Sequence, residues 1–303
     1  KAGKDIYCEK PVSDSLKDAM DLVKAAKKAG IRHGVVQDKL FLPGFAKLMW
    51  LRRTGFFGRV VSARIDAGSW IFDGETQVCQ RPSWNYRKKD GGGLILDMYP
   101  HWRYVIENML GPIRRVVTSM STATPERFDE RGERYAVDVE DNASTLVELE
   151  SGATGVILSS WATRVRRDDL LTAQIDGTKA SAVAGLHRCW TTTNAQTPRT
   201  AHFNIVTDMN IDYRANWQEV AADGPYKNPY RIGWENFLPH VATGSPMKAT
   251  LAAGVRDVQF AEAARVLAEV DWIFLPGGAS GGRGFAGAIL ESLRLDANKL
   301  RPV

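Results

Sequence analysis

Hydrophobic and polar positions follow a strand–helix–strand pattern at the start of the chain. A short apolar run at 5–8 is followed by Ser13, a residue type that often precedes a helix, and then by apolar residues at helical spacing. Gly30 ends this predicted helix, and a second apolar run occupies 31–37. Two strands joined by a helix are typical of a doubly wound parallel sheet, of which this segment would be a remnant.

The rest of the chain reads as a second, larger domain in which strands predominate. Helical spacing predicts a helix at 41–53, and alternation with β-branched residues predicts a strand at 58–70. The same patterns predict further strands and helices at 113–122, 144–150, 153–161, 170–175, 180–184, 189–193, 236–243 and 249–270. We therefore expect an α/β protein in which the doubly wound remnant precedes an α+β domain with a large, mainly antiparallel open sheet and helices on one face.

Composition and charge exclude several classes of protein. The apolar fraction of 44% is ordinary for a globular protein, and the net charge of +5 is spread along the chain, which argues against a nucleic-acid-binding surface. No apolar run approaches the ~20 residues that cross a bilayer. Cys8, Cys79 and Cys189 are far apart, so the sequence predicts neither a metal site nor a disulfide framework. Reduced thiols in a cytoplasmic protein are the simplest interpretation.

Candidate chemistry lies in the stretch from Gly91 to His101, where three glycines precede an apolar segment that carries Asp97 and His101. On a helix, a spacing of four places both side chains on one face, where a carboxylate can fix the tautomer of an imidazole base. A helix start with a chance polar pair explains the same spacing. Pro100 lies between the two residues and predicts either a kink there or a later helix start.

A second short run, Glu9-Lys10-Pro11, follows the first predicted strand. Together with the glycine-rich Asp-x-x-x-His segment, in this order and at this separation, it resembles the Gfo/Idh/MocA oxidoreductases, the family of glucose–fructose oxidoreductase and inositol dehydrogenase. The resemblance extends to about residue 275.

The resemblance implies hydride transfer between NAD or NADP and a secondary alcohol carbon of a sugar, cyclitol or related polyol. It implies that His101 is the acid/base and that Lys10 polarises the reacting oxygen, whereas the alternative for Lys10 is a surface cation. Asp97 would orient the imidazole or hold a substrate hydroxyl. Glu9, Lys10 and Pro11 would lie on the cofactor side. No metal or flavin is implied.

Four other residues are candidates at this site. Lys39 stands where the family usually has Asn or Arg nearby, and it is either a cation near the cofactor or substrate, or a solvated charge at a domain hinge. Trp84, Tyr86 and Arg87 precede the predicted active-site helix and suit stacking on, and hydrogen bonding to, a polyol. The alternative is a surface loop anchored by Trp84.

Two other patterns resemble sites but have simpler interpretations. The acidic cluster of Asp138, Glu140 and Asp141 could pass for a cation site, but we interpret it as a solvated face. The glycines at 282–287 fit a dinucleotide fingerprint, yet too few residues follow for the rest of a nucleotide domain. We interpret them as part of a flexible extension.

We expect three parts: a partial dinucleotide-binding (Rossmann) domain at 1–38, a sheet domain for substrate and dimerisation at 39–276, and a Gly-rich extension at 277–303. In the resembled family a glycine-rich phosphate loop lies far upstream of Glu-Lys-Pro. We therefore expect this chain to lack most of its N-terminal Rossmann domain.

Two alternative functions follow from that expectation. The chain could be a truncated, non-catalytic sheet-domain scaffold or homodimer, or a sugar-binding module without its own cofactor site. For the oxidoreductase we expect a small-molecule sugar or polyol as substrate, no nucleic-acid or membrane partner, and a homodimer or homotetramer through the open sheet.

Overall fold

The first strand–helix–strand segment forms as predicted. In this computed structural model, which describes residues 2–70, 74, 78, 81–165, 167–199, 211–221 and 224–268, β1 (Ile6–Cys8) and β2 (His33–Val35) pair in parallel. The helix α1 (Leu16–Ala29) connects them. Ser15, not Ser13, caps this helix, because its side chain accepts the backbone N–H of Asp18 at 3.2 Å.

The second part of the chain is built on an eight-stranded sheet. Its order is β12-β11-β10-β9-β3-β8-β7-β4, and β3 and β8 run parallel whereas the other neighbours are antiparallel. The predicted mainly antiparallel sheet is therefore confirmed. The strands are β3 (Val60–Gly68), β4 (Ile113–Ser121), β7 (Asn142–Leu149), β8 (Thr154–Ser160), β9 (Leu171–Gly177), β10 (Ala180–Ala184), β11 (Cys189–Thr193) and β12 (Gln218–Glu219).

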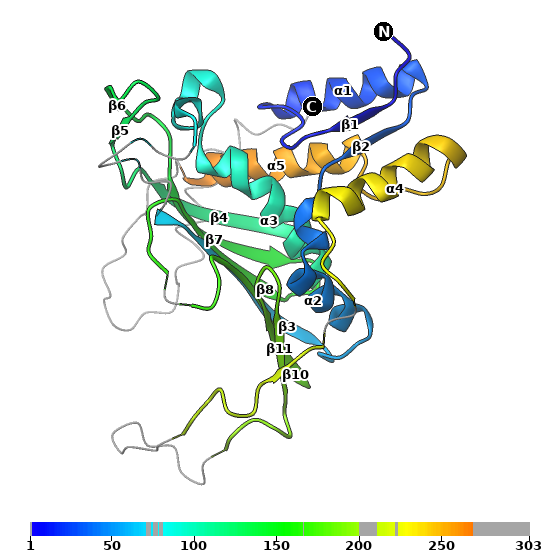
Figure 1. The fold of residues 1–303 in the computed structure, drawn as a ribbon, viewed down its shortest axis with the longest axis vertical. Coiled ribbons are helices and arrows are strands. Elements are labelled where there is room, and N and C mark those ends of the chain that lie inside the picture. The colour runs from blue at the N-terminus through cyan, green and yellow to red at the C-terminus, as the bar shows by residue number, and fades with distance from the viewer. Residues whose placement is uncertain are drawn as a thin grey trace, which may run out of the picture. The chain divides into compact units, whose positions relative to one another are not determined.

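Helices lie along one side of this sheet (Figure 1). They are α2 (Pro43–Arg53), α3 (Leu94–Leu110), α4 (Pro229–Thr243) and α5 (Leu251–Ala268), together with the short 3-10 turns η1 (Asp38–Phe41), η3 (Ser83–Tyr86) and η4 (Lys88–Asp90). The charged stretch after β4 forms a small hairpin of β5 (Glu126–Phe128) and β6 (Arg134–Ala136).

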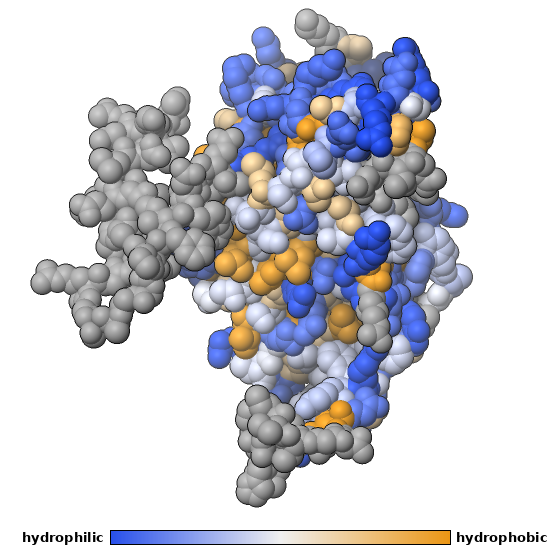
Figure 2. All heavy atoms as spheres, turned by 90° about the vertical axis from the view of Figure 1, so that its left-hand side faces the viewer, coloured by the Kyte–Doolittle hydropathy of each residue, from blue (hydrophilic) through white to orange (hydrophobic). Residues whose placement is uncertain are grey.

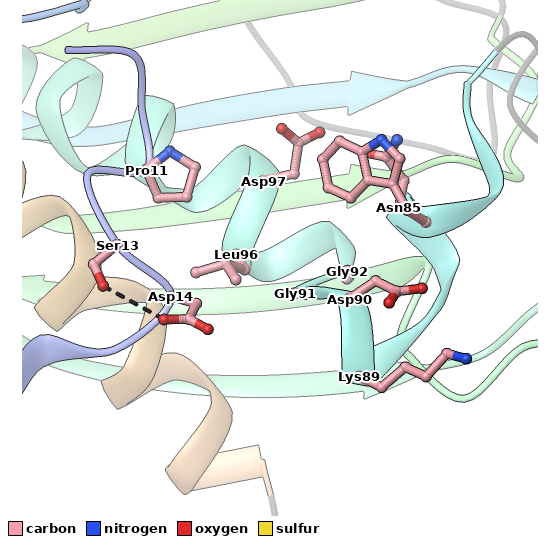
Figure 3. A pocket seen from close by; sticks show the side chains of 12 residues that line it. Pro11, Ser13, Asp14, Asn85, Lys89, Asp90, Gly91, Gly92, Leu96 and Asp97 are labelled. Carbon is pink, nitrogen blue, oxygen red and sulfur yellow. Dashed lines mark hydrogen bonds between the residues drawn. The ribbon is translucent and has the colours of Figure 1, made fainter. Parts of the chain in front are cut away.

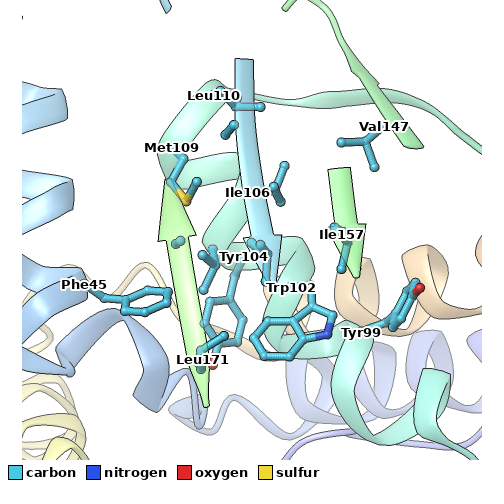
Figure 4. Packing of buried hydrophobic residues seen from close by; sticks show 14 of the residues in the cluster. Phe45, Tyr99, Trp102, Tyr104, Ile106, Met109, Leu110, Val147, Ile157 and Leu171 are labelled. Carbon is cyan, nitrogen blue, oxygen red and sulfur yellow. The ribbon is translucent and has the colours of Figure 1, made fainter. Parts of the chain in front are cut away.

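The main core fills the space between α3 and the sheet (Figure 4). Alternation along the strands sends every second side chain inward, so that Ala63 and Ile65 of β3 are buried while Arg64 between them is exposed. α3 is buried on nearly all sides, with Trp102 and Tyr104 almost completely enclosed. Because α3 is buried, a polar side chain on it needs a partner, which is either a ligand at a functional site or an oppositely charged residue.

The acidic cluster was wrongly interpreted as a solvated face. Asp141 is fully buried and pairs with Arg127, also fully buried, at 2.7 Å. Glu140 is 9% exposed, and its carboxylate accepts the Ile95 N–H at 2.9 Å in the first turn of α3. A carboxylate is favoured there because the N-terminus of a helix carries unpaired N–H groups and partial positive charge. Asp138 alone is exposed. The described residues contain no cluster of potential metal ligands.

Residues Lys1–Glu269 form one compact unit. Within it α1 packs on α5, and a second, smaller hydrophobic cluster joins α1, β2 and α5. The expected boundary between 1–38 and 39–276 stays a prediction. The expected extension at 277–303, including the glycines at 282–287, lies outside the described residues. No helix in the described part of the chain is long and apolar enough to cross a membrane.

Candidate active site

The start of α3 fixes the position of both candidate side chains. Gly93 precedes the helix with φ of 121°, and an added Cβ there would lie 2.7 Å from the Glu140 carboxylate, so glycine leaves room for that carboxylate at the helix N-terminus. α3 begins at Leu94 and continues through Pro100, so the alternative of a later start is wrong. Asp97 therefore lies in the first turn and His101 one turn further on.

Asp97 lies between two cations from other parts of the chain. Lys10 Nζ is 2.5 Å from Asp97 Oδ1 and donates to the Asp97 carbonyl at 2.6 Å, while Arg81 binds Oδ2. All three side chains are largely buried: Lys10 is 12% exposed, Arg81 25% and Asp97 21%. Burial acts to raise the pKa of Asp97, but the charges of Lys10 and Arg81 outweigh it and lower that pKa. The carboxylate is therefore charged at neutral pH.

Lys10 reaches this position from the first parallel strand pair. It follows β1 by two residues, and the Lys10–Pro11 peptide bond is cis. In α/β proteins the carboxyl ends of parallel strands are where ligands bind. Lys10 and Asp97, 87 residues apart in the sequence, thus meet at the carboxyl end of β1 and the start of α3.

A groove of 390 Å³ opens beside this contact. Figure 3 shows Pro11 and Ser13 on one side, Asn85 on the other, and the Asp97 carboxylate between them. Trp84, 51% exposed, also lines the groove. The volume suits a small polyol, and the mixture of an aromatic ring with polar groups suits sugar hydroxyls and the apolar face of a sugar ring.

His101 is buried and bonded through one nitrogen. Its Nδ1 lies 2.7 Å from Tyr104 Oη and 3.6 Å from Asp38 Oδ1, and 6% of its side chain is exposed. Burial, followed by the charges of Lys10, Lys39 and Arg81, lowers the pKa of His101 well below its usual value. The ring is therefore neutral at pH 7, the state that a general base needs.

Lys39 is not a fully solvated charge. Its side chain is 23% exposed, and its Nζ pairs with Asp38 at 2.7 Å. Asp38, whose side chain is 5% exposed, lies in η1, shortly after β2. Its carboxylate contacts Lys39 as well as Tyr104 and His101 of α3. The expectation of a cation near the site fits this position better than a hinge charge does.

The structure contradicts one predicted ligand residue, Tyr86, whereas the roles predicted for Arg87 and Glu9 stay predictions. Tyr86 is fully buried beneath the Arg127 guanidinium, 4.1 Å from its ring centroid, so it has no surface to offer a substrate. Arg87 stacks on Tyr135 at 4.5 Å. Glu9 is exposed, and its carboxylate accepts the Lys10 N–H at 3.2 Å.

Sequence reasoning missed three residues of the site: Arg81, Asp38 and Tyr104. Tyr104 could have been found, because a spacing of three from His101 on one helix brings two side chains together. Asp38 and Arg81 gave no such signal, since each reaches the site from a segment without a regular pattern.

Comparison with known proteins identifies the family. A sequence profile described as "GFO/IDH/MocA C-terminal domain" matches residues 45–183. D-xylose dehydrogenase of Paenarthrobacter nicotinovorans is 43% identical over 265 residues, which are 86% of this chain and 68% of that protein. The chain belongs to the Gfo/Idh/MocA family. Levoglucosan dehydrogenase of Pseudarthrobacter phenanthrenivorans is 29% identical over 62% of this chain and 50% of its own length.

Solved structures agree on the fold of this Gfo/Idh/MocA protein. An NAD-binding oxidoreductase from Klebsiella pneumoniae matches with a TM-score of 0.72 and 20% identity, over 88% of this chain and 72% of that chain. Levoglucosan dehydrogenase in complex with NADH and L-sorbose matches with a TM-score of 0.71 and 24% identity, over the same shares. The predicted family and the predicted mixed α/β fold are therefore confirmed.

The described residues fit the nicotinamide end of a dinucleotide. The carboxyl ends of β1 and β2 lie side by side, since Cys8 pairs with Val35, and they carry Lys10 and Asp38 just beyond. This is where doubly wound proteins bind their cofactors. Lys10 and Pro11 would border the cofactor there, with Lys39 nearby.

Proposed function

We propose that this protein is an NAD(P)-dependent dehydrogenase that oxidises a CH–OH group of an aldose, with Lys10, Asp97 and His101 at the reacting carbon. The observation that carries the proposal is the contact of Lys10 with Asp97, one helical turn before a buried neutral His101. The prediction of an oxidoreductase acting on sugars agrees with the relatives, which include a D-xylose dehydrogenase and a levoglucosan dehydrogenase.

Each residue has a distinct part in this chemistry. Bound NAD(P)⁺ supplies the hydride acceptor, and the hydroxyl proton must leave as the carbon–hydrogen bond breaks. His101, neutral and within a largely dry site, accepts that proton. The Lys10 ammonium stabilises negative charge as it develops on the substrate oxygen. Asp97, held by Lys10 and Arg81, accepts hydrogen bonds from a neighbouring sugar hydroxyl.

D-Xylose is the first substrate to test, because the relative with 43% identity is named for it. Asp97 lines the groove but Lys10 and His101 do not, so the groove would receive the part of the sugar beyond the reacting carbon, with the exposed Trp84 against it. Pentoses, hexoses and anhydrosugars should be assayed with NAD⁺ and NADP⁺, and reduced nucleotide measured by absorbance. The proposal expects saturable turnover of at least one aldose.

A His101→Asn variant tests whether His101 is the base. It should lose about 10²- to 10⁴-fold in turnover while still binding NADH, as followed by nucleotide fluorescence. Full turnover in this variant would remove His101 as the base. An absence of nucleotide binding at millimolar NADH and NADPH would instead leave a sugar-binding module as the better interpretation.

The outer face of the sheet supports a homodimer as part of the same proposal. Val117 and Leu146 face each other across β4 and β7 and are 47% and 60% exposed. Val156 and Leu158 of β8 continue this apolar patch. Figure 2, which views the side of the molecule away from α2 and α4, shows hydrophobic residues gathered on that face. Apolar side chains grouped on an open sheet are typical of protein interfaces.

Sedimentation tests the dimer. The unmodified chain should sediment as a dimer or tetramer at micromolar concentration, and Leu146→Glu should give a monomer that remains folded. Leu22→Glu on α1, 42% exposed, is the matched control. A monomeric unmodified chain would contradict this part of the proposal.

A cytoplasmic location is also proposed, supported by the free thiols of Cys8 and Cys189.

A further inference from the structure

A buried chain of three groups ends on the candidate base. Asp38 lies in η1, Tyr104 lies on α3, and the Tyr104 hydroxyl contacts both Asp38 Oδ1 at 3.4 Å and His101 Nδ1 at 2.7 Å. All three residues are 5% exposed or less. Water therefore competes little for these hydrogen bonds, so the groups themselves decide where each proton lies.

We infer that Asp38 and Tyr104 are positioning residues that hold the His101 ring in the tautomer with its proton on Nδ1, leaving the lone pair on Nε2 for the substrate. The inference deepens the proposed function, because it states which nitrogen of the proposed base receives the proton. Nδ1 is engaged by Tyr104, so only Nε2 remains for a substrate hydroxyl.

The direction of the hydrogen bonds follows from what each partner can do. The Lys39 backbone N–H, 3.3 Å from Tyr104 Oη, can only donate. A charged Asp38 carboxylate can only accept. Tyr104 therefore gives its proton toward Asp38, and its oxygen accepts from an Nδ1–H of His101. The opposite tautomer would place the bare lone pair of Nδ1 3.6 Å from Asp38 Oδ1, which is repulsive.

The same chain suits the protonated state of the ring. When Nε2 takes the hydroxyl proton, the ring becomes positive in a site where Lys10, Lys39 and Arg81 already oppose positive charge. The Asp38 carboxylate, acting through Tyr104, is the nearest negative group on the far side of the ring. It stabilises the imidazolium that proton transfer creates, and it leaves Asp97 to the substrate and to Lys10.

The inference is tested by measuring the tautomer of His101 directly, and this measurement needs no cofactor. The chain should be labelled with ¹⁵N-histidine and its ring nitrogens recorded by two-bond ¹H–¹⁵N correlation at pH 7. His101 is assigned by the signal lost in His101→Asn or, if that variant does not fold, by elimination of the other four histidines through replacement by Gln. We expect a pyrrole-type Nδ1 and a pyridine-type Nε2. The reverse pattern, or two equally populated tautomers, would overturn the inference.

Two variants relate the tautomer to turnover. Tyr104→Phe should shift the His101 nitrogens toward a mixed pattern and lower turnover on the order of 10-fold, with little change in KM. Tyr99→Phe is the matched control, since Tyr99 is also buried on α3 and its hydroxyl bonds Thr145 instead. Asp38→Asn should shift the pattern in the same direction as Tyr104→Phe. An unchanged ¹⁵N pattern in both site variants would refute the inference even if the enzyme is active.

Discussion

α3 carries two ion clusters of opposite composition: one carboxylate with two cations, and one cation with two carboxylates. Near its start, Asp97 lies between Lys10 and Arg81. Further along, Arg103 binds Asp257 of α5 at 2.5 Å and Glu107 at 2.8 Å. The pKa of Asp97 is lowered, whereas burial raises the pKa of Asp257 to about 7.

The difference lies in the balance of charge and solvent. Asp97 is 21% exposed and has two cations to itself, so its charge is well stabilised and remains available to a ligand. Asp257 is 1% exposed and shares one Arg103 with Glu107. The first cluster is suited to bind and orient a substrate, and the second joins α3 to α5.

The largest effect should come from breaking the second cluster. Arg103→Met leaves Asp257 buried without its cation and should lower the free energy of unfolding by about 3–5 kcal/mol. Urea unfolding followed by tryptophan fluorescence measures this. Arg256→Met removes a 52% exposed partner of Glu107 and should cost about 1 kcal/mol or less. Equal losses in both variants would show that burial does not distinguish these pairs.

The first cluster should respond in turnover and not in stability. Lys10→Met should reduce turnover about 10²- to 10³-fold, because the developing charge on the substrate oxygen loses its cation. The free energy of unfolding should change little, since Arg81 still pairs with Asp97. Lys17→Met is the control, because the Lys17 side chain on α1 is 82% exposed, and it should leave both quantities unchanged. Undiminished turnover in Lys10→Met would exclude the proposed role.

The third difference between the two clusters is in pH dependence. Because the pKa of Asp257 is about 7 in the folded protein and about 3.9 unfolded, the folded state retains a proton between these values. Because of Asp257, the free energy of unfolding therefore falls as pH rises from 4 to 7, by at most about 1.4 kcal/mol per pH unit. Asp257→Asn should remove this slope in urea titrations at several pH values.

Asp97 should show the opposite sign. Its pKa is lowered by folding, so its contribution is fully present above the unfolded value of about 3.9 and is lost as pH falls through the folded value. Asp97→Asn should thus leave the slope between pH 4 and 7 unchanged. A slope that disappears in both variants would contradict the assignment of opposite shifts.

The comparison also shows what the sequence could predict. Asp97, His101 and Lys10 were predicted because their motifs are local and ordered along the chain. Arg81, Asp38 and Asp257 were not, because each acts through a contact between segments far apart, such as the Arg103–Asp257 pair across 154 residues. Most strands and helices were predicted, since alternation and helical spacing are local too, but α4 begins at Pro229, ahead of the predicted 236, and β5, β6 and β12 were not predicted as strands.

Two errors have a common physical reason. Tyr86 and the acidic residues Glu140 and Asp141 were expected at the surface, and all three are buried. A polar residue is buried when a partner satisfies it, as Arg127 does for Asp141 and the start of α3 does for Glu140. Such partners cannot be read from the spacing of neighbouring residues.

The position of α5 has a consequence for how the protein is made. Glu262 of α5 accepts the Leu16 N–H of α1 at 2.5 Å, and Asp257 holds both Arg103 and Gln37. These contacts place the last described helix against the segments that carry Lys10, Asp38 and His101. During synthesis these contacts can form only after α5 has emerged from the ribosome, so the packing around these segments is completed late.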